Sequence, residues 1–235
     1  MTTRAMFVPI ALLCACFAPV HAQDPLDGAG YVEGRPDAPI QIIEFADYSC
    51  PFCAKFSRET MPAFRRDWIE TGRASIRFIG FHNSYYEPGR DAARAAECAA
   101  DQDAFWAMHD LIFERQRGWL SRGGQRERFE EWAEELGLDM PAFRLCWKED
   151  PGKDRLEHNT KLARERGVRA TPTFFIGGKK IEGALTYEQL RALLEQENAR
   201  LTAIEPGCWN CSTCYPVASA WRLVARAPWR VGVNL

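Results

Sequence analysis

Residues 40–80 switch twice between strand and helix periodicity, and this constrains the fold more than any other stretch of the chain. The segments IQIIEFA (40–46) and SIRFIGF (75–81) are short, apolar and rich in β-branched residues, as expected of buried strands. Between them, the apolar residues of 51–71 recur at helical spacing, and Pro62 is predicted to kink this helix. A strand, a helix and a second strand in this order predict a crossover connection, and therefore two parallel strands.

A long helical block separates this unit from the rest of the predicted sheet. Residues from about 90 to 166 have helical periodicity throughout, and we interpret their aromatic stripes as packing. Strand character returns at TFFIGG (173–178) and KKIEG (179–183), a predicted hairpin that turns at two glycines. Residues 186–201 then form an amphipathic helix, with Thr186 as its expected N-cap. The sequence therefore predicts an α/β fold with an all-helical insertion.

The N-terminal residues have the pattern of an export signal. Arg4 is the only charge before an apolar stretch that ends in small residues, so residues 1–22 are predicted to be a signal peptide cleaved after Ala22. Lipoprotein processing at Cys16 and a short membrane anchor are the alternatives. Residues 23–33 are expected to form an N-terminal arm. Export predicts a periplasmic location, in which cysteines tend to form disulfides or to carry out disulfide chemistry.

Charge and motif content exclude several classes of function. The formal net charge is −2, which gives no reason to expect binding to nucleic acid. The chain has no phosphate loop and no dinucleotide fingerprint, so no cofactor is expected. The histidines are too scattered to predict a metal site, so surface or packing roles are expected for His82, His109 and His158. Because His82 follows a strand, it is the histidine most apt to lie near Cys50 and Cys53.

Cys50 and Cys53 stand where the first strand passes into the helix, in the order C-P-F-C. Pro51 suits the first helical position, because its missing N–H would be unpaired there in any case. The N–H groups of Phe52 and Cys53 and the positive end of the helix dipole would stabilise a thiolate at Cys50. Cys53, one turn into the helix, would face the protein and stay protonated. The spacing therefore predicts a redox pair with an exposed nucleophile and a buried resolving thiol.

Two further segments are candidates for the same site. Glu44 lies in an apolar strand, where a carboxylate is costly to bury, so we interpret it as a buried acid of raised pKa that relays a proton to or from Cys53. A strand-edge glutamate that faces water is the alternative. Pro172 opens the strand in RATPTFFI; a cis Thr171–Pro172 bond would expose the Thr171 backbone beside the cysteines to an extended peptide, and a simple turn is the alternative.

Together these motifs resemble the DsbA-like branch of the thioredoxin superfamily. The resemblance covers about residues 30–201 and rests on DAPIQIIEFADYSCPFC, on the alanine-rich helix with ECAA followed by FWAMHDLIF, and on GVRATPTFFIGG. It implies a thioredoxin fold built from residues 34–82 and 167–202, with residues 83–166 as the helical insertion. Cys50 would be the attacking cysteine, Glu44 would match the family's buried acid, and ATP would be the cis-proline loop.

The resemblance implies an exported thiol–disulfide oxidoreductase that introduces or exchanges disulfide bonds in secreted or periplasmic proteins. Its implied partners are unfolded or reduced client proteins and a membrane redox partner, either a quinone-linked oxidase or a membrane reductase. We expect a monomer, because only a short arm precedes the fold. Phe52, Thr171 and Pro172 would contact the client.

Two positions depart from the family pattern. Phe52 stands where DsbA itself has histidine, and Thr171 replaces the valine before the cis-proline. An isomerase or a reductase is therefore an open alternative. A non-catalytic copper- or zinc-binding thioredoxin-like protein is a second one.

The other cysteines fall into two groups. Cys98 and Cys146 lie on different predicted helices, where they could form a structural disulfide or remain two buried thiols. Cys208, Cys211 and Cys214 lie in the tail, residues 203–235, and are the only metal candidates. They lack a fourth ligand for zinc or for an iron–sulfur cluster, so no metal site is predicted. The alternatives for the tail are copper(I) binding, a disulfide, an accessory redox segment or an extension without a role in the chemistry.

Overall fold

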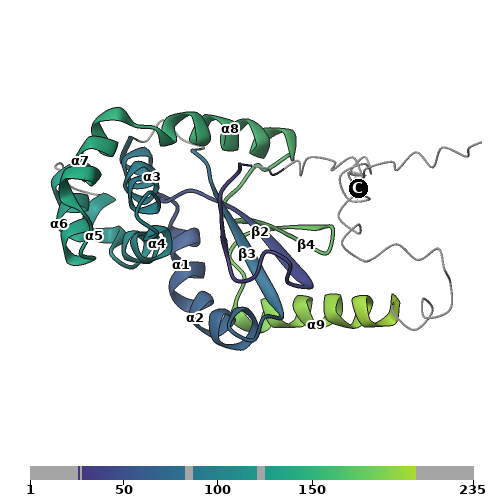
Figure 1. Cartoon of the computed structure of the whole chain (residues 1–235). Coiled ribbons are helices and arrows are strands. Elements are labelled where there is room, and N and C mark those ends of the chain that lie inside the picture. The colour runs from purple at the N-terminus through teal and green to yellow at the C-terminus, as the bar shows by residue number, and fades with distance from the viewer. Residues whose placement is uncertain (1–25, 27, 83–86, 121–124, 205–235) are drawn as a thin grey trace, which may run out of the picture.

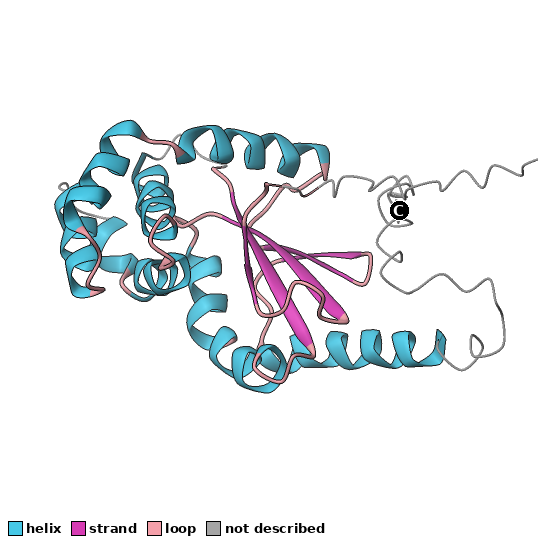
Figure 2. Ribbon diagram, in the orientation of Figure 1, coloured by secondary structure: helices cyan, strands magenta, loops and turns pink. Residues whose placement is uncertain are grey.

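A computed structural model of the chain describes residues 26, 28–82, 87–120 and 125–204. A five-stranded sheet lies at the centre of these residues, in the order β1-β3-β2-β4-β5 (Figures 1 and 2). Strands β2 and β3 are parallel, and the other neighbours are antiparallel. The crossover predicted from residues 40–80 is therefore confirmed. The strands are β1 (Tyr31–Glu33), β2 (Ile40–Ala46), β3 (Ala74–Gly80), β4 (Thr173–Ile176) and β5 (Lys179–Glu182).

The helical segment between β2 and β3 is broken, as Pro62 predicts. One residue separates helix α1 (Pro51–Glu59) from α2 (Met61–Phe64). Helix α2 passes into a π-helical turn, η1 (Arg65–Ile69). Pro62 thus falls in the first turn of a new helix, where a backbone N–H is not required. The hydroxyl of Thr60, at the break, donates a hydrogen bond to the carbonyl of Leu185 over 2.7 Å.

All the regular elements that the structure describes between β3 and β4 are helices, and most of these helices gather at one end of the sheet (Figure 1). Two caps follow local rules: Asp139 accepts a hydrogen bond from the Ala142 N–H, and Thr186 accepts one from the Gln189 N–H. The helices are α3 (Glu87–Ala100), α4 (Phe105–Glu114), α5 (Gln116–Leu120), α6 (Gln125–Glu135), α7 (Met140–Glu149) and α8 (Gly152–Glu165), and α9 (Tyr187–Ile204) closes the fold.

Strand β2 sends its side chains alternately to two cores. Ile40 and Ile42 pack in a cluster with residues of α1, α2 and α9, whereas Ile43 and Phe45 pack in another with residues of α8. Helices α8 and α9 accordingly lie on opposite sides of the sheet (Figure 2). Because side chains of a strand alternate between its faces, Glu44 shares the face of Ile42 and is directed toward α1.

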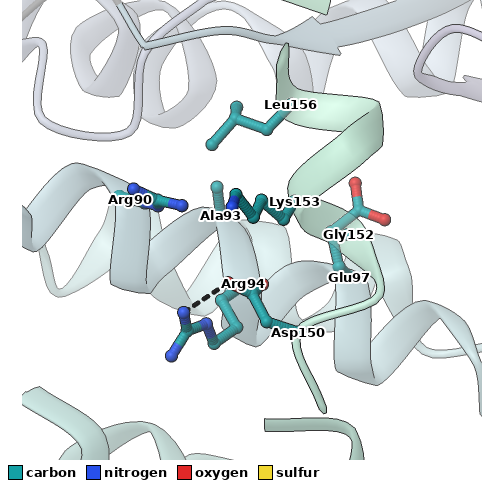
Figure 3. Close-up of a pocket in the computed structure, with 8 residues that line it drawn as sticks. All are labelled: Arg90, Ala93, Arg94, Glu97, Asp150, Gly152, Lys153 and Leu156. Carbon is teal, nitrogen blue, oxygen red and sulfur yellow. Dashed lines mark hydrogen bonds and ion pairs between the residues drawn. The ribbon is translucent and has the colours of Figure 1, made fainter. Parts of the chain in front are cut away.

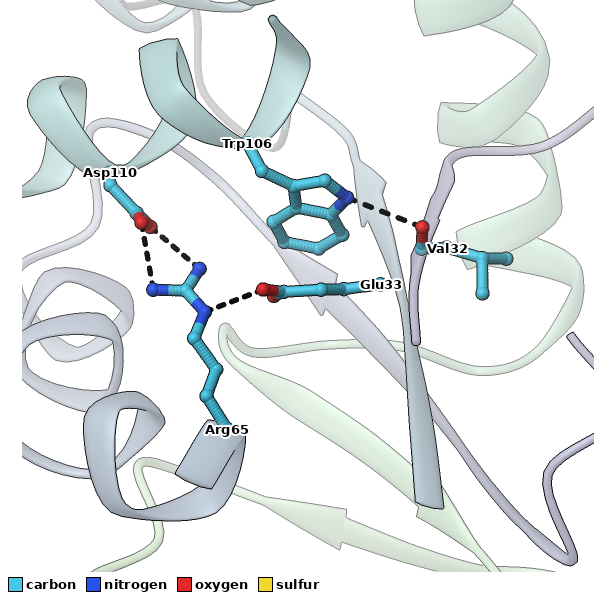
Figure 4. Close-up of polar contacts among 5 residues, drawn as sticks. All are labelled: Val32, Glu33, Arg65, Trp106 and Asp110. Carbon is cyan, nitrogen blue, oxygen red and sulfur yellow. Dashed lines mark hydrogen bonds and ion pairs between the residues drawn. The ribbon is translucent and has the colours of Figure 1, made fainter. Parts of the chain in front are cut away.

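The residues expected to form an N-terminal arm include a strand that was not predicted. Residues 31–33 form β1, which pairs antiparallel with β3, and Val32 stands opposite Arg77. The Val32 carbonyl also accepts a hydrogen bond from the Trp106 indole N–H over 3.3 Å (Figure 4). A three-residue strand is too short to carry a detectable alternation, so its neighbours in space decide its conformation.

A disulfide joins Cys98 of α3 to Cys146 of α7, and both residues are buried. The part of the chain that the structure describes contains no helix with the length and apolar content needed to span a membrane. The predicted signal peptide and Cys208, Cys211 and Cys214 lie outside the described residues.

Candidate active site

The two cysteines of the C-P-F-C motif occupy unequal positions at the start of α1. Cys50 is the N-cap residue, with an extended backbone (φ −77°, ψ 122°), and Pro51 is the first residue of the helix. Cys50 is half-buried and Cys53 has no exposed surface. Both thiols are free, so the structure is that of the reduced pair.

The surroundings of Cys50 favour its thiolate. The pKa of Cys50 is lowered from 9.0 to about 6. The largest cause of this shift is a hydrogen bond from the Cys53 thiol, and burial acts in the opposite direction. The hydroxyl of Thr171 and the backbone N–H groups of Cys53 and Phe52 lower the pKa further. Burial, followed by the hydrogen bond to Cys50, raises the pKa of Cys53 well above its ordinary value. One sulfur is therefore acidic and accessible, and the other stays protonated.

The Thr171–Pro172 segment lies directly against Cys50, 121 residues away in the sequence. The peptide bond between these two residues is cis. The Cys50 thiol donates a hydrogen bond to the Thr171 carbonyl oxygen over 3.3 Å. This carbonyl favours the protonated thiol, whereas the Thr171 hydroxyl favours the thiolate. The structure thus brings together the two segments that the sequence singled out.

Glu44 lies in β2 beneath this pair and is only 4% exposed. Burial, and then the negative charge on Cys50, raises the pKa of Glu44 from 4.5 to about 8. The charge of Glu44 in turn raises the pKa of Cys53. A carboxyl group that is protonated at neutral pH and interacts electrically with both thiols is placed to exchange a proton with the pair.

Phe52 carries a large apolar side chain that is exposed beside the cysteine pair. Its ring is 61% exposed, between the exposed Pro51 and the buried Cys53. Large apolar side chains in such a position, next to a reactive group, are typical of contact surfaces. Phe52 is therefore a candidate for contact with a client.

Two residues of the site have no signal in the sequence. The Gln116 side chain, from α5, donates hydrogen bonds to the carbonyl oxygens of Tyr48 and Cys50 over 2.7 and 2.9 Å. Asp47 accepts hydrogen bonds from the N–H and hydroxyl of Ser49 over 2.8 and 2.6 Å. Gln116 belongs to a different helix and stands among charged residues in ERQR (114–117), so nothing in its local sequence marks it as part of the site.

The described histidines do not form a metal site with these groups. His109 is buried in the core, where its Nδ1 lies 3.2 Å from the Tyr48 hydroxyl, and burial lowers its pKa to about 3. His82 Nδ1 lies 4.0 Å from an oxygen of Asp47, and His158 is exposed. Within residues 26–204, apart from the short gaps, no group of three or more His, Cys, Asp or Glu side chains is arranged to hold a metal ion.

A small concavity lies between α3 and α8, and neither Cys50 nor Cys53 lines it (Figure 3). Its volume is about 10 Å³, which is room for about one water molecule. Arg94 and Asp150 on its wall form an ion pair with each other. The concavity is therefore too small for a substrate.

Comparisons with known proteins agree with this geometry. Residues 27–196 match the family model described as Thioredoxin. The chain is 26% identical over 196 residues to Disulfide bond formation protein D of Bacillus subtilis, which covers 75% of this chain and 83% of that protein. The crystal structure of oxidised BdbD from the same organism superposes with a TM-score of 0.66 at 25% identity, over 74% of this chain and 95% of that one.

A second group of relatives is much longer than this chain. The chain is 32% identical over 186 residues to Na(+)/H(+) antiporter NhaA 3 of Salinispora tropica, which covers 77% of this chain and 27% of the antiporter. The chain spans about a quarter of the length of the antiporters that it matches. On the family match over residues 27–196, the chain belongs to the thioredoxin family, and its fold is similar to that of BdbD.

Proposed function

We propose that the chain catalyses thiol–disulfide exchange on client proteins, chiefly as an oxidant that introduces disulfide bonds. The observation that carries this proposal is the inequality of the two sulfurs: Cys50 is accessible with a pKa of about 6, and Cys53 is buried with a raised pKa. A low pKa makes Cys50 a good leaving group, which a client disulfide needs in order to form.

The reaction begins with the oxidised pair. A client thiolate attacks the Cys50 sulfur, the Cys50–Cys53 bond breaks, and Cys53 leaves with the electron pair and takes up a proton. Burial raises the pKa of Glu44, so its carboxyl group can donate that proton. A second client thiolate then attacks the client sulfur of the mixed disulfide and expels Cys50 as a thiolate. The client loses two electrons and gains a disulfide, and the pair is left reduced.

Three residues around Cys50 form the proposed client-binding surface. The backbone of Thr171 is adjacent to the sulfur and can pair with an extended peptide, a mode in which main-chain hydrogen bonds supply affinity. Pro172, which follows it, has no N–H to compete for the same carbonyl groups. Phe52 offers an exposed ring to an apolar client side chain. A client in an unfolded or reduced state would meet these requirements.

The strength of the oxidant follows from the acidity of Cys50. A pKa of about 6 lies between values of about 3.5 for DsbA and about 7 for thioredoxin, so we expect a milder oxidant than DsbA. A membrane redox partner would reoxidise the pair, and the protein would act as a monomer in the periplasm. The Cys98–Cys146 disulfide supports an oxidising compartment. An isomerase or reductase would instead show a potential close to that of thioredoxin.

Substitution of each cysteine tests the proposal. We expect Cys50→Ser to abolish oxidation of a reduced model peptide. Cys53→Ser, mixed with a disulfide-containing peptide, should accumulate a mixed disulfide at Cys50 as one peptide thiolate is expelled, because no resolving thiol remains in the protein. In the reduced wild type, iodoacetamide should alkylate Cys50 with half of the maximal rate near pH 6. Equal turnover by the wild type and both variants would refute the exchange mechanism. A metal bound at the pair, with no reactive thiol, would instead favour the non-catalytic copper- or zinc-binding protein.

A further inference from the structure

The turn that leads into Cys50 is held from the inside by its own residues. The Cys50 N–H donates a hydrogen bond to the Asp47 carbonyl over 3.0 Å, and the Asp47 carboxylate accepts two hydrogen bonds from Ser49. These contacts close residues 47–50 into a compact turn. These contacts within the turn supply no hydrogen-bond donor to the carbonyl oxygens of Tyr48 and Cys50.

Gln116 supplies those donors from the helical insertion. Its side chain is buried, and its Nε2 lies 2.7 Å from the Tyr48 carbonyl oxygen and 2.9 Å from that of Cys50. A primary amide carries two N–H groups on one nitrogen, so both bonds form at once. Gln116 is the first residue of α5 and is separated from these partners by 68 and 66 residues.

The two bonds fix the Tyr48–Ser49 and Cys50–Pro51 peptide planes, and the second of these planes adjoins the Cys50 side chain. The Cys50 carbonyl otherwise accepts only a long bond, 3.2 Å, from the Ala54 N–H at the start of α1. Rotation of these planes would turn the Cys50 sulfur away from the N–H groups of Phe52 and Cys53. Since hydrogen bonds weaken steeply as their angle falls, a modest rotation is enough to reduce that stabilisation.

We propose that Gln116 is a positioning residue of the redox pair: by clamping the Tyr48 and Cys50 carbonyls it holds the Cys50 sulfur against the N-terminus of α1, and it connects the helical insertion to the thiol. This inference rests on the proposed function of Cys50 and Cys53. It gives the insertion a part in setting the chemistry of the site, beyond covering it.

The test compares two glutamines that each form two side-chain hydrogen bonds to the backbone. Gln102 also forms a pair of hydrogen bonds to the backbone, one to the Asp139 carbonyl and one from the Asp139 N–H, within the insertion. In Gln116→Met, which keeps the length but removes both donors, we expect the pKa of Cys50 to rise by about half a unit to one unit. The equilibrium constant for reduction of the protein by glutathione should fall by about threefold to tenfold. Gln102→Met should leave both quantities unchanged.

The readouts separate a positioning role from a structural one. A purely structural role would lower the midpoint of thermal unfolding in both variants without moving the Cys50 pKa in either, and this result overturns the inference while the proposed function stands. If Cys50 of the wild type titrates as an ordinary thiol, the proposed function and this inference fall together.

A measurement on the unaltered protein keeps the inference testable if Gln116→Met does not fold. The side-chain amide signals of Gln116 in an NMR titration should shift with the same pKa as the Cys50 thiol, about 6, while those of Gln102 stay constant. Amide signals of Gln116 that do not change as Cys50 ionises would contradict the clamp.

Discussion

Burial of the Glu44 carboxyl group affects the stability of the fold, and the same group takes part in the proposed chemistry. Placing a carboxyl group in the core favours its neutral form, and the pKa of about 8 expresses that preference. Because the folded state holds a proton that the unfolded state has released above pH 4.5, the contribution of Glu44 to stability is present below that pH. It is lost as the pH rises through about 8.

The oxidised protein gives the clearest test of this residue, since Cys50 does not titrate there and burial alone acts on Glu44. In the wild type the free energy of unfolding should fall as the pH rises above 4.5, by up to about 1.4 kcal/mol per pH unit from this one group, because burial raises the pKa of Glu44. Glu44→Gln should flatten that slope and slow the release of Cys53 during turnover. Urea unfolding at several pH values measures the slope, and parallel curves for the two proteins would show that Glu44 is ionised in the core.

At the scale of elements, one arginine joins three parts of the chain that are far apart in sequence. Arg65, in η1, donates two hydrogen bonds to Asp110 of α4 over 2.7 and 2.9 Å, and one to Glu33 of β1 over 2.6 Å (Figure 4). The side chains of Arg65 and Glu33 are about one fifth exposed. The guanidinium therefore holds the edge strand and the insertion to the turn that follows α2.

Removal of this arginine should destabilise the fold without changing the redox site. Arg65→Met leaves two carboxylates without their cation, and we expect a loss of about 2 kcal/mol, less than for a fully buried pair because these groups are partly solvated. Arg66→Met is the control: the Arg66 side chain is 67% exposed and paired with Asp67, so its loss should leave the free energy of unfolding almost unchanged. Chemical denaturation measures both, and similar losses in the two variants would contradict the junction.

At the scale of the whole molecule, the helical insertion has its own tether. Cys98 and Cys146 join α3 to α7 across a sequence separation of 48 residues. Closing a loop of that length in the unfolded chain stabilises the native state by about 4 kcal/mol in the chain-entropy model. Since neither sulfur belongs to the site at α1, this disulfide is expected to act on stability alone.

Replacement of the tether should separate stability from redox chemistry. The double variant Cys98→Ala/Cys146→Ala should lose up to about 4 kcal/mol of unfolding free energy, while Cys50 keeps its acidity and its reactivity toward iodoacetamide. Urea unfolding and alkylation near pH 6 measure the two properties. A rise in the Cys50 pKa together with the loss of stability would show that the tether also acts on the redox pair.

Local pattern was enough to predict most of the framework. Strand β2, the hairpin of β4 and β5, the break near Pro62 and the cap at Thr186 all follow from hydrophobic period, turn residues or proline chemistry. The inequality of Cys50 and Cys53 also follows from local structure, because the groups that distinguish them, apart from Thr171 and Glu44, lie within the first turn of α1.

Tertiary structure alone decided the rest. Strand β1, the clamp of Gln116 on Cys50 and the junction at Arg65 join residues tens of positions apart. The physical reason is that hydrophobic period and capping act over a few residues, whereas a buried polar group takes whichever donor or acceptor the packing of other elements brings within about 3 Å.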